Sequence, residues 1–347
     1  GLITAIGALE IEPGDEVILP TWTMCACSIA ILNWNAIPVF ADIDPNTYCI
    51  DPVSIEANIT PNTKAIMAVD IFGQSADMDK IMSIAKKHGI KVISDTAQAP
   101  GSLYKGKMSG TLAHIGGYSL NYHKHIHTGE GGILVTNDDD YCERMQMIRN
   151  HAEAIVKNKK VKSLSNMVGY NFRMGEIEAA IGIEQLKKLR TFLDKRQFIA
   201  NYLSEGLIQL RGLKVPVIKK NNEHAFYIYP IVIDKKIINI SRELIIKSLQ
   251  HEGVPGLING FINLHLYPIY QNKIAYGSKG FPWQSDICKR EVRYEKGICP
   301  VAEELHDKSF IGFEICLFDL EVEDCKLIIK AFKKVWENFN LLGDYEL

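Results

Sequence analysis

The stretch Val17–Ala41, VILPTWTMCACSIAILNWNAIPVFA, contains no charged residue and decides how the first half of the chain folds. It is long enough to raise the question of a membrane-spanning helix. Prolines and asparagines interrupt it, at Pro20, Asn33, Asn35 and Pro38. Because proline breaks helical hydrogen bonding, the stretch instead predicts a buried strand, a helix and a second buried strand.

Outward from this stretch, short apolar runs alternate with helical patterns. The candidate strands are Glu16–Leu19, Pro38–Asp42, Ala65–Ile71, Lys91–Ser94, Ile115–Ser119 and Gly132–Thr136. Met78–His88 is a predicted helix with its apolar residues on one face, and Gly89 ends it. This alternation predicts an α/β fold with a mostly parallel central sheet covered by helices.

The second half of the chain predicts a smaller α+β domain. A helical pattern runs from Glu176 to about Leu207, followed by a candidate strand and two helices at Ala225–Ile233, Arg242–Glu252 and Lys326–Asn338. We therefore expect a large α/β domain over residues 1–188 and a C-terminal α+β domain over residues 189–347. Because the chain opens inside an apolar helical pattern, we also expect the large domain to lack an N-terminal segment.

Composition narrows the class of protein. The 347 residues are 47% hydrophobic and 23% charged, which suits a globular, enzyme-sized protein with a large core. A formal net charge of -2 gives no electrostatic reason to expect a nucleic-acid or membrane partner. The eight cysteines include no Cys-x-x-Cys pair, which favours reduced thiols in the cytoplasm and argues against a zinc ribbon.

Two polar segments follow predicted strands, at the edge of the sheet where ligands gather in open parallel sheets. The first is Ser94-Asp-Thr-Ala-Gln-Ala-Pro-Gly101, and the second is Ser119-Leu-Asn-Tyr-His-Lys-His-Ile-His-Thr-Gly-Glu-Gly-Gly132. Asp95, Gln98, Ser119 and Lys124 are therefore candidates for one shared site.

The second segment resembles the lysine motif of the DegT/DnrJ/StrS family of sugar aminotransferases, which belong to the fold-type-I pyridoxal-phosphate enzymes. The family pattern, Phe-Ser-Phe-x-x-x-Lys-x-x-x-x-Gly-Glu-Gly-Gly, stands here as Tyr118-Ser119-Leu120 through Lys124 to Gly129–Gly132. The resemblance extends over most of the chain and includes Pro13–Val17, Pro38–Asp42, Gly73–Asp79, Asp95-x-Ala-Gln98 and Gly169–Met174. Such an ordered series is far more specific than one motif.

The resemblance assigns roles around the cofactor pyridoxal 5'-phosphate. It implies that Lys124 is the covalent anchor and the catalytic base, and that Asp95 keeps the cofactor's ring nitrogen protonated. Gln98 is expected to contact the ring hydroxyl, and Ser119 the phosphate. Asn171 is expected to reach the phosphate in the neighbouring subunit's site, which implies a homodimer with shared active sites.

The sequence departs from the family in two places. Family members carry a Gly-Thr pair that binds the phosphate just ahead of the first helix, and that pair would lie upstream of Gly1. An aromatic residue often covers the cofactor ring four positions after the proline matched by Pro20; here the position holds Met24, with Trp22 nearby. At both places the expected cofactor site departs from the family pattern.

Other polar residues near these motifs have competing interpretations. Arg173 is a candidate ligand for an acidic group of the amino donor, or a helix-start arginine paired with a glutamate. On an extended segment, His123, His125 and His127 would project from one face and resemble a metal site. Since no carboxylate or cysteine completes that site, we expect no metal, and His123 and His125 remain candidate contacts for the substrate's diphosphate.

The resemblance implies transamination of a nucleotide-linked keto-deoxysugar, with glutamate as amino donor, for the biosynthesis of amino sugars of surface polysaccharides. One alternative is a dehydratase of the same family, in which histidine replaces the lysine; Lys124 favours amino transfer. The other alternative is a non-catalytic regulatory homologue, against which the intact set of Lys124, Asp95 and Gln98 argues.

Overall fold

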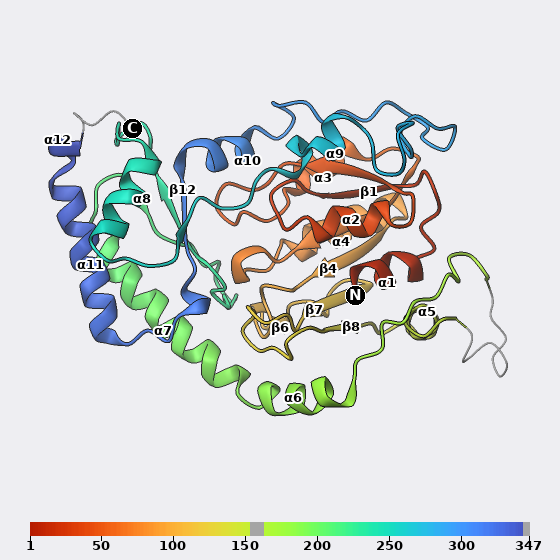
Figure 1. The fold of residues 1–347 in the computed structure, drawn as a ribbon, viewed down its shortest axis with the longest axis horizontal. Coiled ribbons are helices and arrows are strands. Elements are labelled where there is room, and N and C mark those ends of the chain that lie inside the picture. The colour runs from red at the N-terminus through yellow and green to blue at the C-terminus, as the bar shows by residue number, and fades with distance from the viewer. Residues whose placement is uncertain (153–162, 343–347) are drawn as a thin grey trace.

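The computed structural model describes residues 1–152 and 163–342, which form two lobes joined by a long helix (Figure 1). The large lobe contains a six-stranded sheet in the order β2-β1-β3-β4-β7-β8. All neighbouring strands in it are parallel except β7 and β8. Its strands are β1 (Glu16–Pro20), β2 (Ile37–Ala41), β3 (Thr63–Val69), β4 (Lys91–Asp95), β7 (Ile115–Ser119) and β8 (Gly132–Val135).

Five helices and a short turn belong to the same lobe. The helices are α1 (Leu2–Ala8), α2 (Ala26–Leu32), α3 (Pro52–Asn58), α4 (Met78–His88) and α5 (Asp139–Arg149), and the 3-10 turn η1 (Ile71–Gly73) follows β3. A small hairpin, β5 (Leu103–Tyr104) with β6 (Lys107–Met108), lies between β4 and β7 in the chain. Strands β1 and β2 are buried at every position, which explains why their sequences do not alternate and are apolar apart from Glu16, at the start of β1.

The small lobe is built on an antiparallel sheet in the order β11-β12-β10-β9. Its strands are β9 (Leu213–Lys214), β10 (Tyr229–Ile233), β11 (Leu257–Ile258) and β12 (Phe310–Phe313), packed against α7 (Leu189–Leu207), α8 (Arg242–His251) and α11 (Val322–Glu337). Helix α6 (Glu176–Leu186) leads into α7, and α12 (Phe339–Leu342) follows α11.

Residues between β11 and β12 return to the large lobe and cover its sheet (Figure 1). This stretch contains η2 (Leu264–Leu266), α9 (Pro268–Gln271), α10 (Pro300–Glu304) and the π-helical turn η3 (Leu305–Ser309), and η4 (Ile315–Leu317) follows β12. Tyr270 and Tyr294 pack on Phe40 of β2. The guanidinium of Arg290 pairs with buried Glu16 at the start of β1, with 2.7 Å between Nε and Oε1. The domain boundary at residue 188 therefore stays a prediction. Part of the chain after it packs with the large lobe.

Most predicted elements are confirmed. The charge-free stretch folds as β1, α2 and β2, and no helix in the described part of the chain is long and apolar enough to cross a membrane. Helix α4 has the predicted bounds and ends at Gly89, whose φ of +68° is left-handed. The α/β class predicted from the alternation of strands and helices is also confirmed.

Two predicted elements of the second half are present with different bounds. The helical pattern after Glu176 is broken at Lys187 and Lys188 into α6 and α7. The predicted strand from Ala225 begins only at Tyr229, because the backbone N–H groups of Ala225 and Tyr227 donate instead to η1.

Strand β7, which leads into the lysine segment, has little room for side chains. A Cβ at Gly116 would lie 1.7 Å from the backbone oxygen of Gly110, whereas one at Gly117 would meet only the flexible end of Leu134, at 3.3 Å. We expect Gly116→Ala to lower the free energy of unfolding by about 3 kcal/mol or more, and Gly117→Ala by about 1 kcal/mol. Urea unfolding of both variants tests this, and equal losses would contradict it.

Candidate active site

Asp95 ends β4 at the carboxyl edge of the large sheet and is 7% exposed. The backbone N–H of Ala97 donates to its Oδ1 at 3.0 Å, and the thiol of Cys27 donates to its Oδ2 at 3.2 Å. The carboxylate is therefore held from both oxygens, by the turn after β4 and by α2.

Lys124 lies in the turns that follow β7, where its backbone N–H donates to the carbonyl of Asn121. Its amine lies over the ring of Tyr227, 4.5 Å from the centroid, and no residue of the described chain forms an ion pair with it. Burial lowers the pKa of this amine, and the charge of Asp95 opposes that shift. The structure thus brings Asp95 and Lys124 together and leaves the amine easier to deprotonate than that of an exposed lysine.

Gln98 and Ser119 lie on the two segments that carry Asp95 and Lys124. Gln98 is buried, and its Oε1 accepts a hydrogen bond from the backbone N–H of Phe72 at 2.7 Å, so its NH2 group is left to donate to a ligand. Ser119 ends β7, and its half-buried hydroxyl accepts from the N–H of Asn121. Each thus retains a donor that a ligand can use.

Asp70 is a second buried carboxylate at the same edge, and sequence reasoning missed it. It follows β3, is fully buried, and accepts hydrogen bonds from the hydroxyls of Ser94 and Thr96 and from the N–H of Ala76. Burial is the main cause that raises its pKa to about 6, and the nearby charge of Asp95 adds to the shift. The predicted strand had run to Ile71; because β3 ends at Val69, Asp70 is the first residue beyond a strand end.

Met24 lies at the start of α2 and is 52% exposed, with its sulfur accepting from the N–H of Ala26. Trp22 does not take the place of the missing aromatic residue. It is fully buried, contacts the rings of Phe72 and Phe310 edge-on, and donates its indole N–H to the carbonyl of Phe261.

The three histidines around Lys124 do not share a face, because the segment is not extended. The segment forms turns rather than an extended strand, and it leaves His127 exposed but His125 3% exposed. The Nε2–H group of His125 donates to the carbonyl of Ala225, and burial lowers the pKa of the ring to about 3. The ring is therefore neutral, and its contact with a substrate diphosphate stays a prediction. His123 is half-buried beside Tyr122 and Tyr227. In the described chain, no group of three or more metal-binding side chains is found.

Asn171 and Arg173 lie on the exposed segment before α6. Asn171 forms a β-bridge with Asn150, and Nη1 of Arg173 donates to the side chain of the same residue at 2.6 Å. Both residues therefore contact the end of α5. The partner of Arg173 is Asn150 and not the glutamate that the sequence suggested.

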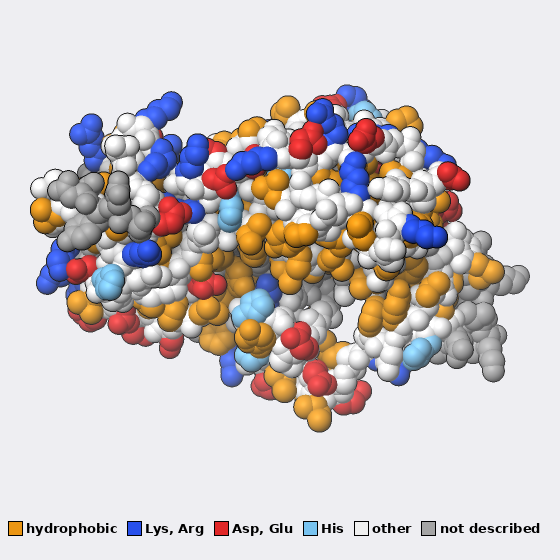
Figure 2. Space-filling view, turned by 45° about the horizontal axis from the view of Figure 1, so that its top comes forward, with side chains coloured by type: hydrophobic (Ala, Val, Ile, Leu, Met, Phe, Trp, Pro, Cys, Tyr) orange, Lys and Arg blue, Asp and Glu red, His pale blue; other side chains and the backbone are white. Residues whose placement is uncertain are grey.

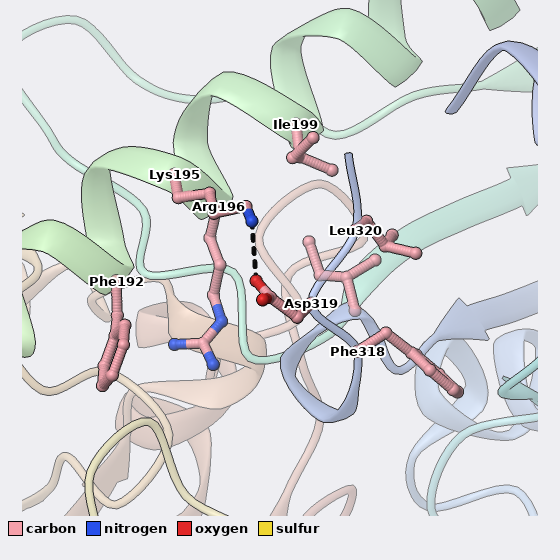
Figure 3. A pocket seen from close by; sticks show the side chains of 8 residues that line it. Phe192, Lys195, Arg196, Ile199, Phe318, Asp319 and Leu320 are labelled. Carbon is pink, nitrogen blue, oxygen red and sulfur yellow. Dashed lines mark hydrogen bonds and ion pairs between the residues drawn. The ribbon is translucent and has the colours of Figure 1, made fainter. Parts of the chain in front are cut away.

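A pocket between α7 and η4 is too small to take a substrate. Figure 3 shows Phe192, Lys195 and Arg196 of α7 facing Phe318 and Asp319, with Lys195 bonded to Asp319. Its cavity of about 40 Å³ has room for only a few water molecules. We place the candidate site at Asp95 and Lys124, because a buried carboxylate and a half-buried amine lie together there.

The raised pKa of Asp70 predicts how its substitution changes stability with pH. An acid whose pKa is near 6 in the folded protein and near 3.8 in the unfolded chain stabilises the fold below pH 4, and this contribution is lost as the pH rises through 6. We expect Asp70→Asn to match the native protein at pH 4 and to exceed its stability by up to about 3 kcal/mol at pH 7. Urea unfolding of the cofactor-free proteins at both pH values tests this, and a difference independent of pH would contradict it.

Comparison with known proteins identifies the family. The model of the DegT/DnrJ/EryC1/StrS aminotransferase family matches residues 1–304. The spore coat polysaccharide biosynthesis protein SpsC of Bacillus subtilis is 35% identical over 297 residues, which are 84% of this chain and 76% of SpsC. GDP-perosamine synthase of Caulobacter vibrioides is 37% identical over 268 residues, 77% of this chain and 70% of that enzyme.

The solved structures give the same result. An aminotransferase from Psychrobacter cryohalolentis superposes with a TM-score of 0.82 and 31% identity, over 98% of this chain and 85% of that one. With a sheet of this topology and a family match across most of its length, the chain belongs to the DegT/DnrJ/EryC1/StrS aminotransferase family.

Proposed function

We propose that the protein is a pyridoxal-phosphate-dependent aminotransferase that transfers nitrogen from glutamate to a nucleotide-linked keto-deoxysugar in polysaccharide biosynthesis. The observation that carries the proposal is the half-buried Lys124 amine, without an ion-pair partner in the described chain, beside the buried carboxylate of Asp95. Family membership supports the amino transfer, and the names of SpsC and GDP-perosamine synthase support the substrate class.

The residues present fit the cofactor. Its aldehyde needs a lysine that is readily deprotonated, its ring nitrogen needs a carboxylate, and its hydroxyl and phosphate need neutral donors. Lys124, Asp95, Gln98 and Ser119 supply these four groups at one edge of the sheet. When bound, pyridoxal phosphate supplies an electron sink that stabilises negative charge on the carbon next to the nitrogen.

The chain's own residues would then act as follows. Lys124 would anchor the cofactor and, once displaced by the amino donor, its Nζ would move a proton between the substrate carbon and the cofactor. Burial of the amine favours this role, because a neutral Nζ can accept the proton. Asp95 would keep a proton on the ring nitrogen, and Met24 would lie near the ring in place of an aromatic residue. Arg173 and His123 remain candidate substrate contacts.

Substitution of Lys124 tests the proposal. We expect Lys124→Ala to remove the visible absorbance of bound cofactor and to lower amino transfer at least about a thousandfold. Lys64→Ala, which changes an exposed lysine at the start of β3, is the matched control and should behave as the native protein. A native protein that takes up no cofactor, or a Lys124→Ala variant that keeps the activity, would contradict the proposal.

Product analysis separates this reaction from the dehydratase alternative. Assay of a panel of nucleotide keto sugars should show glutamate consumed in equal amount to aminated sugar. Loss of water from the sugar without glutamate consumption would favour the dehydratase, and no turnover of any sugar would favour a regulatory homologue.

We further propose a homodimer in which α6 faces the second copy. The helix has no buried residue, and its exposed apolar side chains include Ile177 at 76% and Ile183 and Leu186 at 61% each. Figure 2 shows hydrophobic side chains with acidic neighbours at the lower tip, where Figure 1 places α6. An apolar helix face of this kind is stabilised by a protein partner. Asn171, just before α6, would then approach the partner's cofactor phosphate.

Charge placed on α6 tests the dimer. We expect the double substitution Ile177→Asp and Ile183→Asp to turn a dimer into a monomer at micromolar concentration, because each buried aspartate would lose its hydration. Ile208→Asp, which changes an exposed residue at the end of α7, is the control. Light scattering measures the mass; a monomeric native protein, or a variant that stays dimeric, would contradict the interface.

The cytoplasmic location is also a proposal. All eight cysteines are free thiols, which is the state expected in a reducing compartment.

A further inference from the structure

Cys27 is the side chain in contact with Asp95 that no part of the proposed reaction yet uses. It lies in the first turn of α2 and is 1% exposed, with its sulfur 3.2 Å from Oδ2 of Asp95. On its other side the sulfur lies 3.7 Å from the hydroxyl of Thr23. The thiol therefore fills the space between α2 and the end of β4 and has one charged acceptor.

The thiol acts as a donor rather than as a nucleophile. Burial, together with the charge of Asp95, raises its pKa well above the ordinary value, so the sulfur keeps its proton at physiological pH. A buried carboxylate can accept that proton in a hydrogen bond but cannot donate to it while ionised. The direction of the bond, from Cys27 to Asp95, is therefore fixed.

The other groups around Asp95 explain why the hydrogen bond from Cys27 matters. The described titratable side chains that act on it are Cys27 from α2, Asp70 after β3 and Lys124 after β7. Among the bonds described here, only the N–H of Ala97 and the thiol of Cys27 donate to the carboxylate. Removing the thiol would leave Oδ2 without a protein donor, free to rotate and free to accept another hydrogen bond more strongly.

We propose that Cys27 is a positioning residue, whose S–H group orients the Asp95 carboxylate and weakens it as a hydrogen-bond acceptor for the cofactor's ring nitrogen. The inference rests on the proposed function, because it gives Asp95 the ring nitrogen as its partner. It extends that function to a residue that acts through its contact with Asp95.

The hydrogen-bond strength of the donor at position 27 should set the affinity for the cofactor and the pH midpoint of the cofactor's visible absorbance. A hydroxyl donates more strongly than a thiol, and a methyl group does not donate. We expect Cys27→Ala to weaken cofactor binding roughly fivefold and to move the pH midpoint of the cofactor's visible absorbance by about half a unit. Cys27→Ser should move that midpoint in the opposite direction and keep native affinity.

Cys49→Ala is the matched control. Cys49 is equally buried at 1%, but its thiol donates to the carbonyl of Gln74, at 3.4 Å, and not to Asp95. Its removal should leave both the affinity and the midpoint unchanged. Equal midpoints for the serine and alanine variants, or an equal shift for Cys49→Ala, would overturn the inference.

Infrared spectroscopy of the cofactor-free protein supplies a test that does not depend on cofactor binding or on folding of the Cys27 variants. The S–H stretching band lies in a spectral region without other protein bands and moves to lower frequency when the thiol donates. We expect Asp95→Asn to move the Cys27 band upward, and an unchanged band would overturn the inference. If the native protein binds no cofactor but Asp95→Asn still moves the band, the proposed function is wrong while the contact between Cys27 and Asp95 stands.

Discussion

The carboxylate of Asp95, buried at the end of a parallel strand, is the constraint on which the rest of the site depends. A buried negative charge is stable only when donors surround it. Here the turn after β4 provides one donor and α2 provides another, while the amine of Lys124 supplies a nearby positive charge. The same burial lowers the pKa of the Lys124 amine. One buried edge of the sheet therefore holds both the carboxylate and an amine that loses its proton readily.

The sheet explains why these groups meet. Strands β3, β4 and β7 are parallel neighbours, so their carboxyl ends lie at one edge although the residues after them are far apart in the chain. Asp70, Asp95 and the Lys124 segment follow these three strands in order. The small lobe adds Tyr227 over the Lys124 amine from the segment that precedes β10. The site thus lies where the two lobes meet. The stretch between β11 and β12 packs against the core of the large lobe.

The sequence could predict the features that depend on local pattern. These features include the charge-free stretch Val17–Ala41, the glycine that ends α4 and the polar residues after β4 and β7. The family was also recognisable. What it could not predict depends on tertiary contacts. The break between α6 and α7 carries no glycine or proline, and β10 starts late because the backbone N–H groups of Ala225, Tyr227 and Ile228 donate to η1. Asp70 was missed through a two-residue error in a strand end, and Cys27 because nothing in its spacing relates it to Asp95.

The central claim, that Lys124 is the lysine that holds the cofactor, is tested most directly by chemical trapping. Native protein is mixed with pyridoxal phosphate, reduced with borohydride, digested and examined by mass spectrometry. The account predicts that the added phosphopyridoxyl mass lies on Lys124, in the segment between Ser119 and Gly132. A modified lysine elsewhere, or none after cofactor has been supplied, would contradict it.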